Sequence, residues 1–275
     1  MTNSVNTNPG AMIALQNLNK SNMELQQVQN RINTGLNIAG AKDNGGIFAI
    51  AQRMRAEVSG YGVVQQSLDR GNATLDVSLA AGEAISDLLI EMKEKALAAA
   101  DTSLDTASRS ALNEDFMALR NQISTIVENA EFNGVNLIDG STDAFVALAN
   151  QDGSNTITVP SEDMSLSGAV VTVGAAASFA TATQASDIAS QIASSLDAVN
   201  ESLARLGTKS KALEIHSTFV TKLSDTLEKG IGNLVDADLA KESARLQSLQ
   251  VKQQLGIQAL SIANASPQSV LSFFR

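Results

Sequence analysis

Proline is rare in this chain, and its placement constrains the fold more than any other feature of the sequence. The three prolines are Pro9, Pro160 and Pro267. The long stretches 10–159 and 161–266 therefore contain no residue that must break a helix. Few enzymes leave such stretches uninterrupted, whereas long helices require them. We therefore expect long helices on both sides of Pro160.

Apolar residues recur at alternating steps of three and four residues, which is the spacing of one helix face. In residues 47–99 this stripe predicts a single helix of about 80 Å, at about 1.5 Å per residue. A shorter stripe from Leu112 to Ala130 predicts an antiparallel partner after a turn at residues 101–105, and a third stripe predicts a long helix over residues 196–234. Such spacing favours coiled-coil-like packing in a long antiparallel helical bundle.

The segment between the helical halves has a different pattern. Asn133-Gly134 is a turn signal, and residues from there to about 184 are rich in Ser, Thr, Gly, Ala and Val. β-branched residues in short runs between turn formers predict a few strands, at Ile157, Val159, Val170, Val171 and Val173. The expected fold class is mainly α, with a small β-hairpin insert over about residues 133–184.

Both ends of the chain are apolar on more than one helix face. A helix of this kind must be buried on several sides, although chain termini usually fray at the surface. Copies packed side by side around a common axis would bury both ends, so we predict a helical filament in which the ends become ordered on assembly. The predicted self-assembly contacts are Leu18, Leu25, Val28, Ile32, Leu246, Leu249, Leu255, Leu260, Ile262, Leu271, Phe273 and Phe274.

Composition and charge exclude several classes of function. Aromatic residues make up 3% of the chain, whereas small-molecule pockets usually have aromatic walls. A net charge of −10 repels nucleic acids and anionic membranes, so we expect neither as a partner. The absence of cysteine excludes disulfides and thiolate metal sites. No segment approaches the roughly 18 apolar residues that span a bilayer, and the first ten residues do not resemble a cleaved signal peptide.

Two groups of residues could suggest metal chemistry, but a structural role is the better interpretation of each. His216 is the only histidine, so we expect a partly exposed helix residue rather than a ligand or a triad member. Asp236, Asp238 and Glu242 carry the oxygen atoms that hard cations prefer, but the two aspartates do not share a helix face. We expect a helix start there, with Asp236 near the N-cap.

Two glycine-containing segments also receive structural interpretations. Residues 43–46 lack the Gly-Lys-Ser of a phosphate loop, so we expect a turn that caps the long helix. Gly230, Gly232 and Asn233 interrupt the apolar stripe, and we expect a joint between an outer and an inner helix at this point. The sequence thus predicts no catalytic residue, no metal and no cofactor.

Motifs at both ends of the chain carry a resemblance to a known family. The N-terminal motifs are SVNTN (4–8), LQNLN (15–19), QNRINTGL (29–36), AKDNGG (41–46) and FNGV (132–135). The C-terminal motifs are DADLAKE (236–242), QQLG (253–256) and ALSIANASPQSVLSFFR (259–275). In this order and at these ends, they resemble bacterial flagellin over roughly residues 1–140 and 196–275. The short insert resembles flagellins that lack large outer domains.

The resemblance implies a structural subunit that polymerises into the extracellular flagellar filament for swimming. It implies a filament-core coiled coil from residues 1–40 and 235–275, and an outer helical domain from residues 41–234. It also implies export, without a cleaved signal peptide, through the flagellar export apparatus with a secretion chaperone. The expected partners are other flagellin subunits, the filament cap and the hook-junction proteins.

Two departures from the family pattern bear on function. The family usually has Ser-Gly-Leu-Arg-Ile where this chain has residues 34–38, Thr-Gly-Leu-Asn-Ile. Some flagellins are sensed by an innate immune receptor through an Arg-Glu-Leu stretch, which corresponds here to Lys93, Glu94 and Lys95. Lys is a poor substitute for Arg at a bidentate contact, so we expect weak receptor activation. Flagellins with short inserts can carry O-linked sugars, here on unassigned Ser or Thr residues within 141–183.

Three alternatives remain open from the sequence. A hook–filament junction protein resembles flagellin at both ends but assembles in few copies. An amphipathic helix protein of a lipid surface would use the apolar stripes on a membrane, but it usually has Lys/Arg flanks and interfacial Trp. An enzyme would need a nucleophile with a base, a metal cluster or a cofactor loop.

Overall fold

The computed structural model describes residues 7–271, with side chains to residue 265. In this part of the chain five helices and two β-hairpins follow one another, which confirms the mainly α fold class. The chain divides into two compact units. The terminal unit comprises Met1–Ala56 and Thr226–Arg275, and the central unit comprises Glu57–Asp225.

The predicted long helices are present. Helix α2 spans Gly45–Ala99 and α3 spans Thr106–Asn129, joined by a turn in which the Arg109 guanidinium donates to the carbonyls of Ala99, Asp101 and Leu104. Helix α4 spans Ala182–Val235 and begins well before the predicted Leu196. It begins earlier because Ala185, Ile188 and Ile192 continue the buried face toward the N-terminus.

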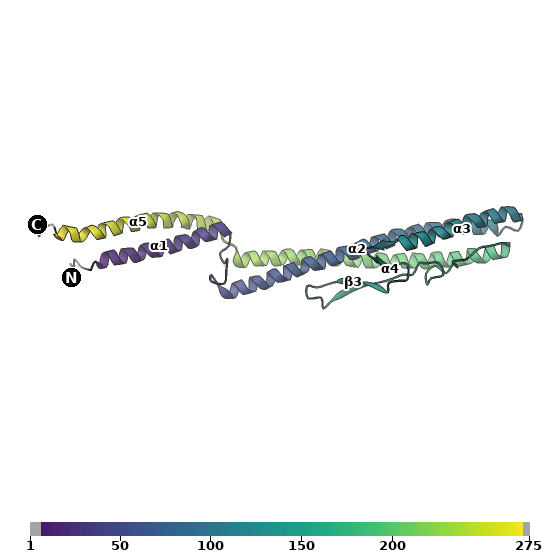
Figure 1. The fold of residues 1–275 in the computed structure, drawn as a ribbon, viewed down its shortest axis with the longest axis horizontal. Helices are drawn as coiled ribbons and strands as arrows, with labels where there is room; N and C mark the ends of the chain where they lie inside the picture. The colour runs from purple at the N-terminus through teal and green to yellow at the C-terminus, as the bar shows by residue number, and fades with distance from the viewer. Residues whose placement is uncertain (1–6, 272–275) are drawn as a thin grey trace. The chain divides into compact units, whose positions relative to one another are not determined.

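The core of the central unit lies along α2, where its inner face meets α4 and α3 (Figure 1). The two long helices are antiparallel, since a Cβ added at Gly71 would lie 3.1 Å from Leu213 and one added at Gly82 would lie 2.7 Å from Leu203. Fully buried aliphatic residues fill this seam. The ring centroid of Phe116 of α3 lies 5.2 Å from that of Phe179, with the two rings tilted by 54°. The fully buried residues of α2 and α4 include Leu68, Leu75, Ile85, Leu89, Met92, Val199 and Leu213.

Two hairpins form the insert. β1 (Glu131–Phe132) pairs with β2 (Val135–Asn136) around the predicted turn, where Asn133 and Gly134 both have positive φ angles of 52° and 81°. β3 (Ala144–Leu148) pairs antiparallel with β4 (Thr156–Pro160), which contains the predicted Ile157 and Val159.

The strand predicted at Val170, Val171 and Val173 is wrong. These side chains are buried, as β-branched residues in a strand would be, but the backbone there has no strand partner in the described structure. The amide of Val170 donates to the Asp163 carbonyl at 2.9 Å, and the Thr172 amide donates to the Ser195 hydroxyl of α4 at 3.0 Å. Tertiary contacts therefore replace a β ladder.

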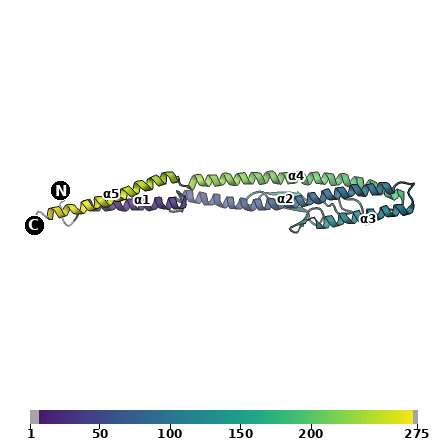
Figure 2. The same ribbon diagram turned by 90° about the horizontal axis from the view of Figure 1, so that it is seen from above.

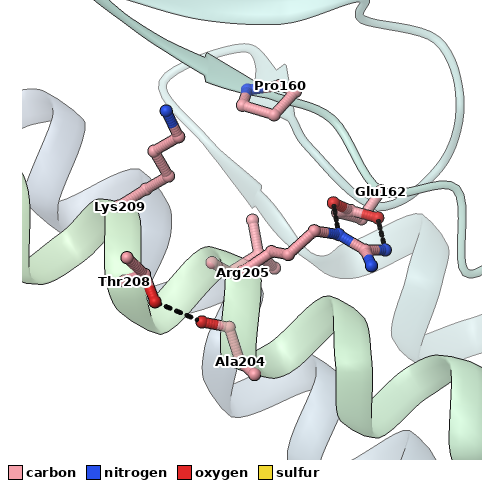
Figure 3. Close-up of a pocket in the computed structure, with 7 residues that line it drawn as sticks. Pro160, Glu162, Ala204, Arg205, Thr208 and Lys209 are labelled. Atoms are coloured by element: carbon pink, nitrogen blue, oxygen red, sulfur yellow. Dashed lines mark hydrogen bonds and ion pairs between the residues drawn. The ribbon is translucent and has the colours of Figure 1, made fainter.

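A buried carboxylate ties the insert to α4. Glu162 accepts two hydrogen bonds of 2.7 Å from the Arg205 guanidinium and one of 3.1 Å from the Ser202 hydroxyl. Figure 3 shows Arg205 reaching from α4 to Glu162 beside a pocket of about 320 Å³ that Pro160 and Lys209 also line. The hydrogen bonds from Arg205, more than the one from Ser202, hold the pKa of Glu162 below its usual range against the opposing effect of burial.

Candidate self-assembly interface

The terminal unit is built on two antiparallel helices, α1 (Pro9–Thr34) and α5 (Leu239–Leu271), which lie side by side in Figures 1 and 2. Asn8 caps α1 by accepting a hydrogen bond from the Ala11 amide at 3.0 Å, and Pro9 provides a favourable first residue. Gly35, at φ 71°, ends the helix in the left-handed conformation.

Helix α5 begins close to the predicted helix start, and its N-cap is Asp238. The carboxylate of Asp238, not that of Asp236, accepts hydrogen bonds from the amides of Ala240 and Lys241, both at 3.1 Å. Asp236 instead forms an isolated antiparallel bridge with Leu36. The predicted helix start is confirmed, with Asp236 two residues before the cap.

The predicted joint at Gly230, Gly232 and Asn233 is also wrong, because α4 continues through these residues to Val235. The two glycines accommodate close neighbours: an added Cβ would lie 3.0 Å from Met54 at Gly230 and 2.7 Å from the Asp236 carboxylate at Gly232. The chain leaves the helix after Val235, whose carbonyl accepts from the amides of Asn37 and Ile38 at 2.7 and 3.2 Å.

Polar contacts at three levels set the register of α1 against α5. Asn8 Nδ2 donates to the Ala263 carbonyl at 2.6 Å, and Gln253 Nε2 donates to Asn22 Oδ1 at 2.8 Å. At the other end of the pair, Arg31 Nη1 lies 3.1 Å from Glu242 Oε1. A one-turn slip of the helices would separate all three pairs, so these contacts favour one alignment.

The predicted seam residues face the partner helix to different degrees. Val28 and Leu249 are each 2% exposed. Leu18 packs against Gly256, where an added Cβ would lie 3.2 Å from its Cδ1. The remaining predicted residues on this side are half-buried: Leu25, Ile32, Leu246 and Leu260.

Other apolar residues lie on the outside of the helix pair. Leu255 is 58% exposed and Ile262 is 72% exposed, although both belong to the predicted assembly contacts. Met23, 63% exposed on α1, was absent from the predicted set. Its position in the sequence places Met23 off the helix face shared by Leu18 and Leu25, so the spacing could have identified it as an outward-facing apolar residue. Phe273, Phe274 and the side chain of Leu271 lie outside the described residues.

The residues considered from the sequence for metal or phosphate binding have structural roles. The His216 ring lies 2.8 Å from the Ala149 carbonyl, and Asn44 Oδ1 caps α2 by accepting from the Ile47 amide at 3.1 Å. In the described part of the chain, no group of three or more acidic or histidine side chains could hold a metal ion. Within the same residues no helix is both long and apolar enough to cross a membrane.

The segment equivalent to the receptor motif lies on α2. Glu94 is exposed, whereas Lys93 and Lys95 are half-buried. Lys95 Nζ lies 3.1 Å from Asp115 Oδ2 of α3. The insert presents exposed hydroxyl residues within 141–183, among them Ser141, Thr156 and Thr158. Neither the receptor response nor the attachment of sugars is decided by these positions, and both stay predictions.

Known proteins resemble this chain along its whole length. Residues 5–143 match the bacterial flagellin N-terminal helical region, and residues 189–274 match the bacterial flagellin C-terminal helical region. Flagellin FljK of Caulobacter vibrioides is 57% identical over 273 residues, and flagellin FljM of the same organism is 56% identical; each alignment covers 99% of both chains. A flagellin of Brucella melitensis is 37% identical, again over 99% of both chains.

Two solved structures share the fold. Bacillus cereus flagellin aligns with a TM-score of 0.50 at 19% identity, over 56% of this chain and 88% of that one. A putative flagellar hook-associated protein from Vibrio parahaemolyticus aligns with a TM-score of 0.60 at 13% identity, over 70% of this chain and all of that one.

Proposed function

Because this chain belongs to the bacterial flagellin family, we propose that its paired terminal helices are the surface through which it polymerises. Members of the family are structural proteins, and this chain is a subunit of the extracellular flagellar filament that serves motility. We assign residues 1–40 and 235–275 to the filament core and residues 41–234 to the outer domain. No enzymatic activity is part of this proposal.

One observation supports the paired terminal helices as the polymerisation surface most strongly. The α1–α5 seam is already filled by Val28 and Leu249, yet Leu255 and Ile262 stand outside it more than half exposed. Large apolar groups gathered outside a filled seam mark a protein–protein contact. In a filament, neighbouring copies of the same helix pair would cover them.

Outward-facing substitutions test this surface. Leu255→Asp with Ile262→Asp places two charges on it without entering the seam. The matched control is Gln254→Asp with Ser261→Asp, which places the same charges at adjacent exposed positions. We expect the first variant to stay monomeric after seeding and the control to form filaments visible by electron microscopy. Normal filaments from the first variant would overturn the proposal.

A deletion of residues 256–275 provides a coarser test, since it removes Ile262 together with the C-terminal part of α5. We expect a soluble monomer that does not polymerise. Robust filaments from this truncation would contradict the assigned surface. Extended filaments from the full chain, rather than short rings, also distinguish a filament subunit from a hook–filament junction protein.

The remaining partners follow from the same proposal. The subunit would leave the cell unfolded through the flagellar export apparatus with a secretion chaperone, and it would add at the distal tip beneath the filament cap. Hook-junction proteins would contact the first subunits. Ser and Thr residues within 141–183 are the proposed sites of O-linked sugars, and an intact mass equal to that of the bare chain from native filaments would exclude them.

A further inference from the structure

The chain contains two Asn-Gly pairs, Asn44-Gly45 and Asn133-Gly134. In such a pair the backbone nitrogen of the glycine can attack the side-chain amide of the asparagine, because glycine has no Cβ to obstruct the approach or to restrict the backbone. The reaction consumes water and replaces the asparagine by aspartate or isoaspartate. The structure places the two pairs in different surroundings, so their reactivity should differ.

Asn44 is held as the N-cap of a long helix. Its Oδ1 accepts a hydrogen bond from the Ile47 amide at 3.1 Å, and its backbone carbonyl accepts one from the Phe48 amide at 3.0 Å. Gly45 is already the first residue of α2. The Gly45 nitrogen reaches the Asn44 side-chain carbon only if that side chain leaves its cap position and the backbone rotates, which breaks both hydrogen bonds. The first turn of α2 therefore protects Asn44.

Asn133 lies instead at the tip of a short hairpin. It is exposed and has a φ of 52°, and Gly134 follows with a φ of 81°. The strands on either side, β1 and β2, are two residues long each. A ribbon of this size is marginally stable, so its tip opens locally at small cost. The space around Gly134 is open, since the nearest described atom to an added Cβ would be Glu131 Oε1, at 4.0 Å.

We propose that Asn133 is a site of spontaneous deamidation in the folded protein and that Asn44 is not. The backbone nitrogen of Gly134 loses its proton and forms a bond to Cγ of Asn133. The bond between Cγ and Nδ2 breaks, and Nδ2 leaves as ammonia with that proton. Water then opens the cyclic imide. Cleavage at the side-chain carbonyl leaves aspartate at position 133, and cleavage at the main-chain carbonyl leaves isoaspartate, in which the backbone runs through Cγ.

Isoaspartate at this position should loosen the attachment of the first hairpin to α3. It inserts a further carbon atom into the backbone of a tight turn, and so disturbs the pairing of Phe132 with Val135. The next residue of β2, Asn136, is 5% exposed. Its Nδ2 donates to the Val127 carbonyl of α3 at 2.7 Å, and its Oδ1 accepts from the Ile138 amide at 2.9 Å. A shift of the turn would strain both of these buried hydrogen bonds.

Incubation of the full-length monomer in mildly alkaline buffer, with and without urea, tests this assignment. Peptide mass spectrometry measures the conversion of Asn133 and Asn44, and labelling by an isoaspartyl methyltransferase identifies isoaspartate. In urea the two pairs should react at similar rates. In the folded chain Asn133 should react at least about tenfold faster than Asn44, since an N-cap stabilises a helix start by about that factor. Equal rates in the folded chain, or an intact Asn133 over the time in which the unfolded chain converts, would overturn the inference.

Asn133→Gly is the matched variant, because glycine adopts the positive φ of this turn and carries no amide. After the same incubation the unaltered chain should melt at a lower temperature than fresh protein, whereas aged and fresh Asn133→Gly should melt alike. An unaltered chain that carries isoaspartate and keeps its melting temperature would overturn the proposed loosening of the hairpin. Both measurements use the monomer, so their outcome is independent of whether the chain polymerises as proposed.

Discussion

Arg31 of α1 and Glu242 of α5 form an ion pair inside the seam of the terminal helices. Their side chains are 21% and 10% exposed, and Nη1 lies 3.1 Å from Oε1. A charge at such a position is stable only while its partner is present, because removal of either one leaves the other poorly solvated. The pair therefore contributes more to the alignment of the two helices than to their net stability.

Glu242→Ala should destabilise the assembled filament by about 3 kcal/mol, since it leaves Arg31 without its carboxylate in the seam. Replacement of both residues by leucine should recover most of this loss. The measurement is the urea concentration at which filaments dissociate. The control is Lys241→Ala at the adjacent exposed position. An Arg31→Leu, Glu242→Leu variant as weak as the single variant would contradict this account of the pair.

Acidification should weaken the attachment of the insert to α4. The pKa of Glu162 lies below its unfolded value, so its contribution to stability is fully present above an unfolded pKa of about 4.3 and is lost as the pH falls through the folded value. Glu162→Gln should therefore be less stable than the unaltered chain at pH 7, and the difference should shrink as the pH falls below about 4.

Urea unfolding of the monomer at several pH values measures this difference. Glu201→Gln provides the control, because its carboxylate is exposed and lies 3.8 Å from the same Arg205. A difference between Glu162→Gln and the unaltered chain that stays constant down to pH 3 would rule out titration of Glu162 as its cause.

Two glycines of α2 should respond in opposite directions to the same substitution. At Gly71 an added Cβ would lie 2.7 Å from the Phe145 ring and 3.1 Å from Leu213, so Gly71→Ala should destabilise the monomer by about 1–3 kcal/mol. At Gly62 nothing lies within 4 Å, so Gly62→Ala should stabilise it by about 0.5–1 kcal/mol. Thermal unfolding of both variants gives the comparison; equal effects would show that Phe145 does not pack on Gly71.

The purified monomer should activate the innate immune receptor weakly. Lys93 stands where the family motif has Arg, and it cannot make the bidentate contact of a guanidinium. Lys95 replaces an apolar residue, and its ammonium group is paired with Asp115. A receptor reporter assay checks this, and Lys93→Arg with Lys95→Leu should raise the response. Strong activation by the unaltered chain would contradict the prediction.

Much of the helical fold was predictable, because both helix formation and the packing of a helix seam follow the spacing of apolar residues along the local sequence. The three-four stripe located α2 to within two residues at its start, and Asn133-Gly134 located the first hairpin. The errors occur where distant contacts decide the local structure. The Ser195 hydroxyl accepts a hydrogen bond from the Thr172 amide, where a strand was predicted. Met54 lies so close to Gly230 that a side chain there would crowd it, although the helix continues through this glycine.

The candidate interface was predictable in part for a similar reason. Spacing alone separates the seam residue Leu249 from the outward Leu255, because both positions lie on one regular helix. It does not reveal which outward residues touch another copy, since that depends on how copies are arranged. The backbone bridge between Asp236 and Leu36 joins residues 200 positions apart, and local sequence does not show it.

Hydrogen exchange along α1 and α5, in dilute monomer and in filaments, tests the central claim most directly. If neighbouring copies bury the outer faces of these helices, amides near Leu255 and Ile262 should exchange rapidly in the monomer and become strongly protected on polymerisation. Equally strong protection in the isolated monomer would show that a single copy stabilises its own ends, and it would contradict this account of assembly.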